Sequence, residues 1–537
     1  MSDTADVLIV GAGVAGALAA WRLTQAGLRV TVVEAGPRIS RTTAVEQYRR
    51  TAIRVPESPY PAVPHAGRPA SINDSYIRQE GPDRFRSGYL RQVGGTTWHW
   101  LGTALRLLPS DFELHSRYGI GADWPLKYKD LEPWYAAAET ELGVSGHDDD
   151  TFGPPRAIPF PMPGLPPTLG DKALSEVARQ LGFNVRVSPQ ARNSQPYDER
   201  PACCASSSCI PICPVQAKYD ATVHLAKAEA AGARILSDSV AVQIEIASNG
   251  RARGLLIRRP DRSDFWLGAR HIVIAAHAIE GPKLLLMSRN EQWPDGVANR
   301  SGAVGRYLMD HPMQLTRALA PAPVWPRRGP QEVSAIHEMR EGDHRRRHGA
   351  FMMNVGNQGW QWAGPDLDGL AKTFIAAGLH GSALSNALRM HASREMTLVA
   401  LTEQLPYRNN RILPDYERLD NIGAPKPRIF FQLDEYTKAA LATARATHEQ
   451  LFKALGATDI GHTSYAEGAG HIMGTTRMGT DAKTSVADTN GQSHDHPNLW
   501  FAGSSLFPTS GTANPTLTIA ALALKMADTL IGLIAKQ

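Results

Sequence analysis

Short apolar runs, each followed by a turn and then a helical pattern, recur at the beginning, middle and end of the chain. Residues 6–10 form an apolar run typical of a buried parallel strand. After a glycine-rich turn, residues 17–25 predict a helix that ends before Gly27. A second strand is predicted over residues 29–33. The order of strand, helix and strand predicts the start of a parallel α/β sheet.

The same pattern returns twice. Residues 271–276 predict a buried strand, followed by a helix over 281–288. Near the end, a strand is predicted over 499–503 and a long helix over 515–531. We therefore expect one domain assembled from non-contiguous segments. The segment from about 313 to 460 carries no glycine fingerprint and is expected to form a separate substrate-side domain.

Composition narrows the class of protein. The chain has 537 residues, 42% of them hydrophobic and 20% charged, which indicates a folded protein of two or three domains. Its net charge is only +5, and the densest basic tract, residues 343–348, is short and lacks aromatic residues, so nucleic-acid binding is not expected. No unbroken run of 18 apolar residues occurs, so no membrane span is expected. The acidic start predicts no signal peptide, which by itself indicates the cytoplasm.

The first motif is the turn after residues 6–10. It has the spacing Gly11-x-Gly13-x-x-Gly16, and Glu34 follows 18 residues after Gly16. Glycines at these positions let backbone N–H groups approach a pyrophosphate at a helix N-terminus, and the carboxylate can bind ribose hydroxyls. The alternative is a tight turn without a ligand. Strand, helix and acidic residue together favour a dinucleotide site.

The second motif covers residues 93–100. Paired glycines, Gly94 and Gly95, let the backbone pass close to a flat or charged group. His99 lies between two tryptophans, and a packed aromatic cluster explains that arrangement equally well.

All four cysteines, Cys203, Cys204, Cys209 and Cys213, fall within eleven residues. Clustered thiolates suit soft metals. Adjacent cysteines point in different directions, which leaves three well-spaced ligands, the number that a [3Fe–4S] cluster needs, and Pro214 after the last cysteine is typical of ferredoxins. Zinc, or cysteines without a metal, remain the alternatives.

The fourth motif joins two segments near the end of the chain. His471 is followed after 43 residues by Asn514. Oxidation of an alcohol by hydride transfer needs a base for the hydroxyl proton and a polar group for the oxygen, and these side chains suit both roles. A structural histidine is the alternative for His471. Asn514 is alternatively the cap of the helix that starts at Pro515, whose N-terminus would favour an electron-rich group.

Together these motifs resemble the glucose–methanol–choline (GMC) oxidoreductase family of flavoproteins, nearly from end to end. The segment 275–285 departs slightly: the family usually has Gly where His277 or Ala278 stands, and Thr where Gly281 stands. Within the family, residues 93–100, the cysteines and the segment 309–312 resemble the large subunits of bacterial sugar dehydrogenases, which act on glucose, fructose, gluconate or glucosides.

The resemblance implies roles for individual residues. His471 becomes the base and Asn514 its partner, while Cys203, Cys209 and Cys213 hold a [3Fe–4S] cluster and Cys204 is spare. His99 falls where some relatives attach the flavin covalently. FAD is expected to contact Gly11, Gly13, Ala15, Gly16, Glu34, Ala35, Gly94, Gly95, Thr96, His99, Ala276, Gly503, Asn514 and Thr516.

The fold class implied is α/β: a Rossmann-like FAD-binding domain built from discontinuous segments, plus an α+β substrate domain with an antiparallel sheet. The FAD-binding domain is expected to comprise residues 1–50, 85–115, 190–312 and 462–537, with the iron–sulfur loop at 200–215. Residues 51–84, 116–189 and 313–461 are expected to form the substrate domain and connecting segments.

The activity implied is oxidation of a hydroxyl of a sugar, glycoside or sugar acid by hydride transfer to flavin N5. Electrons would leave through the cluster to a cytochrome c or quinone-linked acceptor. The alternative is an oxygen-using oxidase of the same fold with non-functional cysteines. The relatives' large subunits are exported beside a small chaperone subunit with a twin-arginine signal. The resemblance therefore moves the expected location to the periplasm, with membrane association only through partners.

Overall fold

The computed structural model describes residues 5–51, 58–63, 65, 75–148, 153–359 and 367–536. Part of the predicted segment 51–84 lies outside these residues.

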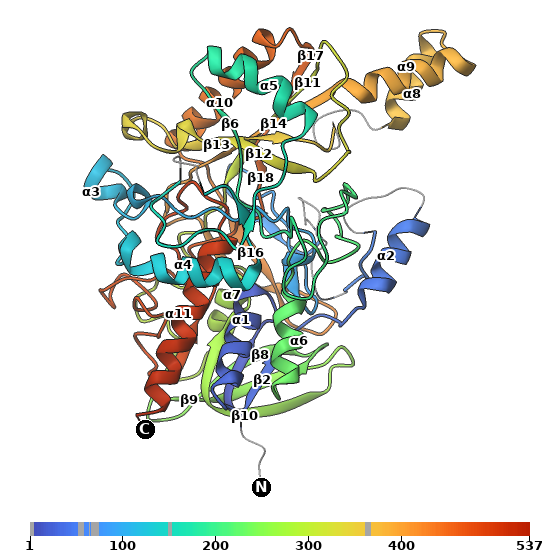
Figure 1. Ribbon diagram of the computed structural model, residues 1–537. Helices are drawn as coiled ribbons and strands as arrows, with labels where there is room; N and C mark the ends of the chain where they lie inside the picture. Colours follow the sequence, from blue (N-terminus) through green and yellow to red (C-terminus); the bar gives the residue numbers. More distant parts are fainter. Residues whose placement is uncertain are drawn as a thin grey trace.

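The first sheet joins strands from the beginning, middle and end of the chain, as the sequence predicts (Figure 1). Its strand order is β7-β2-β1-β10-β9-β8, and β19 also pairs with β10. The bounds are β1 Ala5–Val10, β2 Val30–Val33, β7 Arg234–Leu236, β8 Val240–Ile246, β9 Ala252–Arg258, β10 Asp264–Ile274 and β19 Leu499–Phe501.

Strand β10 has both antiparallel and parallel neighbours. Its first half, residues 264–268, pairs antiparallel with β9, while its second half pairs parallel with β1 and β19. The parallel half is almost fully buried, which explains why the three residues after His271 are all apolar. The predicted strands and helices of this region are confirmed, with bounds shifted by a few residues.

Helices α1 Val14–Gln25, α4 Tyr128–Leu142, α6 Thr222–Ala230 and α11 Thr516–Ile534 pack together beside this sheet (Figure 1). Helix α11 is apolar enough, by length and composition alone, to cross a membrane, and its most apolar stretch has a mean hydropathy of 1.8. It nevertheless packs against α1 and α4, and 56% of its most apolar stretch is buried. Its apolar character is therefore accounted for by core packing.

The second sheet has the order β17-β11-β14-β13-β12-β6, and β18 pairs with β11. All of its pairings are antiparallel. The bounds are β6 Val185–Val187, β11 Pro312–Leu319, β12 Glu332–Ile336, β13 Phe351–Gly356, β14 Glu395–Thr402, β17 Thr458–His462 and β18 Glu467–Gly468. One face of this sheet is covered by helices α5 Leu169–Gln180 and α10 Glu435–Ala454.

Side-chain alternation gives the second sheet two distinct faces. On β14, Leu398 and Ala400 pack under the helices, while Val399 and Leu401 face a cavity. Strands β11 and β13 alternate in the same way. The helix-free face of this sheet therefore forms one wall of the candidate site.

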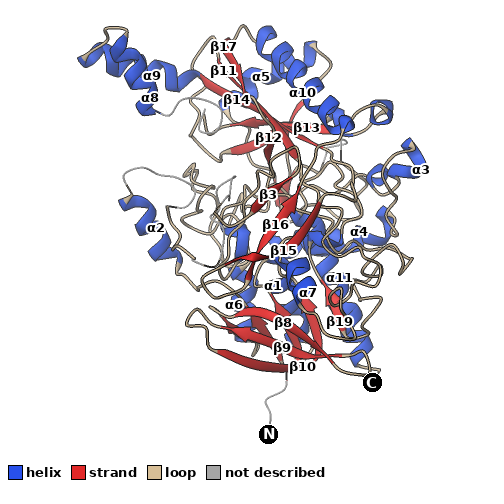
Figure 2. Cartoon of the chain, turned by 180° about the vertical axis from the view of Figure 1, so that it is seen from behind, coloured by secondary structure: helices blue, strands red, loops and turns tan. Residues whose placement is uncertain are grey.

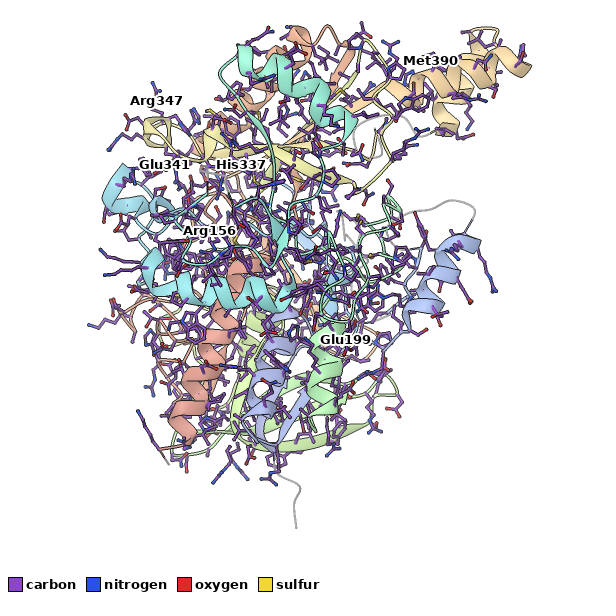
Figure 3. The ribbon with its side chains drawn as sticks, in the orientation of Figure 1. Arg156, Glu199, His337, Glu341, Arg347 and Met390 are labelled. Atoms are coloured by element: carbon purple, nitrogen blue, oxygen red, sulfur yellow. The ribbon has the colours of Figure 1, made fainter. Side chains whose placement is uncertain are left out.

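A smaller sheet lies between these two layers (Figure 2). A third sheet contains β3 Arg78–Glu80, β15 Arg411–Leu419 and β16 Pro425–Phe430, and β4 Ser145–Gly146 pairs with β5 Met162–Pro163. The other helices are α2 Arg41–Arg50, α3 Leu114–Tyr118, α7 Glu280–Met287, α8 Leu367–Ala376 and α9 Gly381–Arg394. Helices α8 and α9 project from the body, and Met390 on α9 is 54% exposed (Figure 3).

Candidate active site

A cavity of about 400 Å³ lies between the two main sheets. The glycine turn after β1, the end of β2, the loop 88–103 and the turn after β10 form one part of its wall. The helix-free face of the second sheet forms another part, and the two segments containing His471 and Asn514 complete it. The lining includes these predicted site residues: Gly11, Gly13, Ala15, Glu34, Ala35, Gly95, Thr96, His99, Ala276, His471, Gly503, Asn514 and Thr516.

Two predicted cofactor residues, Gly16 and Gly94, lie behind the lining. A Cβ on Gly16 would overlap the carbonyl oxygen of Gly11, so this glycine lets α1 pack against the turn. Gly94 has a φ of +99°, and a Cβ there would overlap the indole of Trp98. Both glycines therefore shape the cavity without reaching its surface.

The glycine turn is held by Glu34 at the end of β2. The amide N–H of Ala12 donates to one carboxylate oxygen of Glu34 and the N–H of Gly36 to the other, each at 2.9 Å. Burial raises the pKa of Glu34, while these two bonds oppose the shift. At the N-terminus of α1, Gly13 provides no side-chain cap. The N–H groups of the first helical turn are therefore available to an anionic ligand.

A buried charge cluster adjoins the turn after β10. Arg91 and Lys283 both bind Glu280, at 2.6 and 2.7 Å, and Tyr76 donates to the same carboxylate at 2.8 Å. Arg91, Glu280 and Lys283 line the cavity. Two cations on one carboxylate leave a positive charge at the wall. No motif in the sequence predicts this cluster, because Arg91 lies far from the other two residues along the chain.

His471 is bonded to a second histidine, His311, which sequence motifs give no role. The two Nδ1 atoms are 2.8 Å apart, and Nε2 of His311 lies 3.1 Å from the carbonyl oxygen of Gly511. Burial lowers the pKa of His311 to about 4 and that of His471 well below its usual value, and protonation of His311 would lower the pKa of His471 further. Both rings are therefore neutral near pH 7.

The proton positions of the two rings follow from these partners. A carbonyl oxygen only accepts, so the Nε2 of His311 donates to Gly511 and its Nδ1 is left as an acceptor. His471 must then donate from its own Nδ1. The Nε2 of His471 is consequently unprotonated, and this is the nitrogen nearest Asn514.

Asn514 is oriented toward His471 and does not cap helix α11. Its Nδ2 lies 3.4 Å from the Nε2 of His471, while its Oδ1 is buried without a hydrogen-bond partner in the described chain. Helix α11 begins at Thr516, and its cap position, Pro515, makes no side-chain bond. Asn514 therefore does not cap α11, because its side-chain oxygen accepts no backbone N–H.

Asp310 fixes the backbone around both histidines. One of its carboxylate oxygens accepts from the N–H of His311 at 2.7 Å and from the N–H of His471 at 2.9 Å, and the other accepts from the hydroxyl of Ser87. Burial raises the pKa of Asp310 to about 6, against the effect of these bonds. One carboxyl group thus ties strand β11 to the segment that carries His471.

Polar side chains also line the cavity from the second sheet. Glu332 accepts a bond of 3.0 Å from the hydroxyl of Thr103, and burial raises its pKa to about 7. The side-chain oxygens of Asn354 and Gln358 are buried without a partner in the described residues. This wall therefore offers acceptors opposite the glycine turn. Sequence motifs do not single out these residues, because their direction depends on the register of the sheet.

The cysteine loop lies next to the loop that carries His99. Cys209 and Cys213 are buried, Cys203 is partly buried and Cys204 is exposed, and none forms a disulfide. Burial raises the pKa of the Cys203 thiol, and the charges of Cys209 and Cys213 act in the same direction. Within the described residues, no three His, Cys, Asp or Glu side chains are arranged to hold a metal ion.

His99 faces the cavity from the second motif. Its ring packs edge-on against Tyr60, with ring centroids 6.4 Å apart, and it also lines the cavity. Burial and the charge of Lys218 lower the pKa of His99 to about 3, which keeps the imidazole neutral. The structure therefore combines both interpretations of this motif, an aromatic packing contact and a cavity wall.

Two family models match the chain. Residues 406–523 match the GMC oxidoreductase model, and residues 6–108 match the model of FAD dependent oxidoreductases. Solved structures share the fold, and two of them serve as examples. Pyridoxine 4-oxidase from Mesorbium loti has a TM-score of 0.65 at 17% identity, covering 98% of this chain and 99% of that one. A formate oxidase variant from Aspergillus oryzae has a TM-score of 0.68 at 14% identity, covering 100% and 99%.

Curated relatives match over the whole chain. The fructose dehydrogenase large subunit of Gluconobacter japonicus is 38% identical, covering 98% of each chain. The 2-methyl-1,2-propanediol dehydrogenase of Mycolicibacterium austroafricanum is 28% identical, covering 98% of this chain and 95% of the relative. The gluconate 2-dehydrogenase flavoprotein of Pantoea cypripedii is 24% identical over 96% and 92%. The glycine turn, His471 and Asn514 lie around one cavity, and the relatives match over the whole chain. The chain therefore belongs to the GMC oxidoreductase family.

Proposed function

We propose that the protein is an FAD-dependent dehydrogenase that oxidises a hydroxyl of a sugar, glycoside or sugar acid and delivers the electrons to an external acceptor. The observation that carries this proposal is the hydrogen bonding of His471 and His311, which leaves the Nε2 of His471 as an acceptor beside Asn514 in the cavity. The relatives named as fructose and gluconate dehydrogenases support the substrate class.

The residues present fit FAD. The bare N-terminus of α1 suits its pyrophosphate, Glu34 its ribose, and the positive charge of Arg91 and Lys283 adds to the attraction for an anion. Gly11, with a φ of +103°, allows the backbone approach that such a ligand needs. When bound, FAD supplies a hydride acceptor, its N5 atom, which the protein itself lacks.

The chain's own residues manage the proton and the oxygen. The Nε2 of His471 takes the hydroxyl proton of the substrate, and His311 holds the ring so that this nitrogen stays free. Asn514 donates a hydrogen bond from Nδ2 to the same substrate oxygen. Glu332, Asn354 and Gln358 hydrogen-bond the remaining hydroxyl groups, which suits a polyol better than an apolar alcohol.

Three cysteines, Cys203, Cys209 and Cys213, are proposed to hold a [3Fe–4S] cluster that relays electrons one at a time. Their burial supports this choice of ligands, because Cys209 and Cys213 are buried and Cys203 is partly buried in one loop, whereas Cys204 is exposed. These three thiols would hold the irons of the cluster, which would supply a one-electron carrier. Covalent attachment of the flavin through His99 is also proposed, because its neutral imidazole lines the cavity.

We also propose a small partner subunit bearing a twin-arginine signal, a cytochrome c acceptor and a periplasmic location. The support is the identity of 38% with a protein named as a large subunit. Fractionation of cells that make the chain with and without a co-encoded small partner tests the location. Retention in the cytoplasm with the partner present would refute it.

The experiment that tests the main proposal is a panel of sugars, sugar acids and simple alcohols with an artificial dye acceptor, run beside an oxygen electrode. Dye reduction with a sugar and little hydrogen peroxide is expected. Rapid peroxide formation would favour an oxidase of the same fold, and iron and labile-sulfide analysis separates the two on independent grounds.

A further inference from the structure

Two buried cations, Lys218 and Arg192, lie between the cavity and the cysteine loop. Each side chain belongs to a residue that is only 1% exposed. The ammonium of Lys218 donates to the carbonyl oxygens of Trp98 at 2.9 Å, Trp100 at 2.5 Å and Cys209 at 3.0 Å. Its backbone N–H lies 3.5 Å from the sulfur of Cys213. Lys218 thus connects the backbone on both sides of His99 with the cysteine loop.

Arg192 is left with unused donors. Its Nη2 donates to the carbonyl oxygen of Leu101 at 2.5 Å, but its Nε and Nη1 are buried with no acceptor among the described residues. The carbonyl oxygen of the next residue, Asn193, accepts from the N–H of Cys203 at 2.9 Å, which places Arg192 beside the cysteine loop. Two orphaned N–H groups of a buried guanidinium at this place indicate an acceptor that the described residues do not provide.

The charge of this pair is poorly balanced by the protein. All three hydrogen-bond acceptors of Lys218 are neutral carbonyl groups. The charge of Arg192 also acts on the carboxyl group of Glu332 and lowers its pKa. Burial nevertheless raises this pKa to about 7, so Glu332 is only partly ionised at neutral pH. Buried cations without a full partner are costly. Three thiolates, inorganic sulfide and iron together form a centre with a net negative charge, which would balance both cations.

We propose that Lys218 and Arg192 form a cation pair that stabilises the reduced form of the iron–sulfur centre held by Cys203, Cys209 and Cys213. This inference rests on the cluster of the proposed function. Reduction adds one electron to the centre, and no bond forms or breaks. The two fixed positive charges would stabilise the added negative charge. The reduction potential of a cluster depends on its net charge, on hydrogen bonds to its sulfur atoms and on burial. The cation pair would supply positive charge and hydrogen-bond donors at a buried site. Through Trp98 and Trp100, Lys218 also fixes the loop beside His99 against the centre.

The test is a redox titration of the cluster followed by electron paramagnetic resonance, with iron counted per chain. Lys218→Met and Arg192→Met should each make reduction of the cluster about tenfold less favourable, which is about 59 mV for a one-electron couple. In the Lys218→Arg variant, the equilibrium constant for reduction of the cluster should return to within about threefold of the wild-type value. The matched control is Lys525→Met, because Lys525 is a half-buried lysine on α11 held by Thr489 and Asn490, away from the cysteines. It should leave the potential unchanged.

Each outcome decides one question. Unchanged potentials in both Met variants with full iron content would overturn the cation-pair inference and leave the proposed function intact. Iron loss in Lys218→Met that Lys218→Arg reverses supports a need for charge, while iron loss in both variants indicates a need for exact shape and overturns it. Absence of iron and sulfide from the wild-type protein would refute the cluster itself, and this inference with it.

Discussion

Replacing His311 by Phe tests whether this residue sets the protonation of His471. The change removes both ring nitrogens and keeps a planar ring of similar size, so His471 loses the acceptor for its Nδ1 proton at 2.8 Å. A buried donor without a partner costs about 1–3 kcal/mol. The ring avoids that cost by moving its proton to Nε2, which is the wrong nitrogen for a base. We therefore expect flavin reduction to slow by about 5- to 150-fold, since each 1.36 kcal/mol is tenfold.

The assay is the anaerobic rate of flavin bleaching at saturating substrate, which isolates the step before electron transfer to any acceptor. His448→Phe is the matched control, because His448 is also fully buried and bonded to Thr316 at 2.9 Å, but lies in the second sheet's core. It should leave the bleaching rate unchanged. A His311→Phe protein that is folded, loaded with FAD and as fast as the wild type would refute the reasoning about the tautomer.

Replacing Cys209 by Ser should lower iron content and slow reduction of an external acceptor far more than flavin bleaching; loss of bleaching in an FAD-loaded protein would contradict the relay. The bleaching rate should stay flat from about pH 8 down to 6.5, because burial lowers the pKa of His471 and keeps it an unprotonated base; a fall centred near 6.5 would refute this. Replacing Glu34 by Ala strands two buried N–H groups, so FAD content should fall sharply, and an unchanged dissociation constant in equilibrium dialysis would remove Glu34 from the FAD site.

Much of the fold could be predicted because its signals are local. The strand over residues 5–10, the helix that begins at Val14 and the long helix that begins at Thr516 each carry their pattern within one short segment. The glycine turn and Glu34 are close in sequence, so spacing alone brings them together. Such elements are determined by residues that are neighbours along the chain.

The rest depends on contacts between distant segments. His311 lies 160 residues before His471, and only the pairing of β11 with its neighbours brings the two rings together. Asn514 precedes a proline at the start of a helix, which is a good capping pattern, yet burial of the cavity wall turns its amide toward His471. The acceptor of Asn354 faces the cavity because of the strand register of the second sheet, and Gln358 lines the cavity from the loop after the same strand; no short motif encodes either position.

The most direct test of the central claim is flavin bleaching by substrate in the His471→Ala variant, measured anaerobically with the bound FAD quantified. The account predicts a normal complement of FAD and a bleaching rate lower by about 100-fold or more, because the base for the hydroxyl proton is gone. A rate equal to that of the wild type would contradict the assignment of His471 as the base.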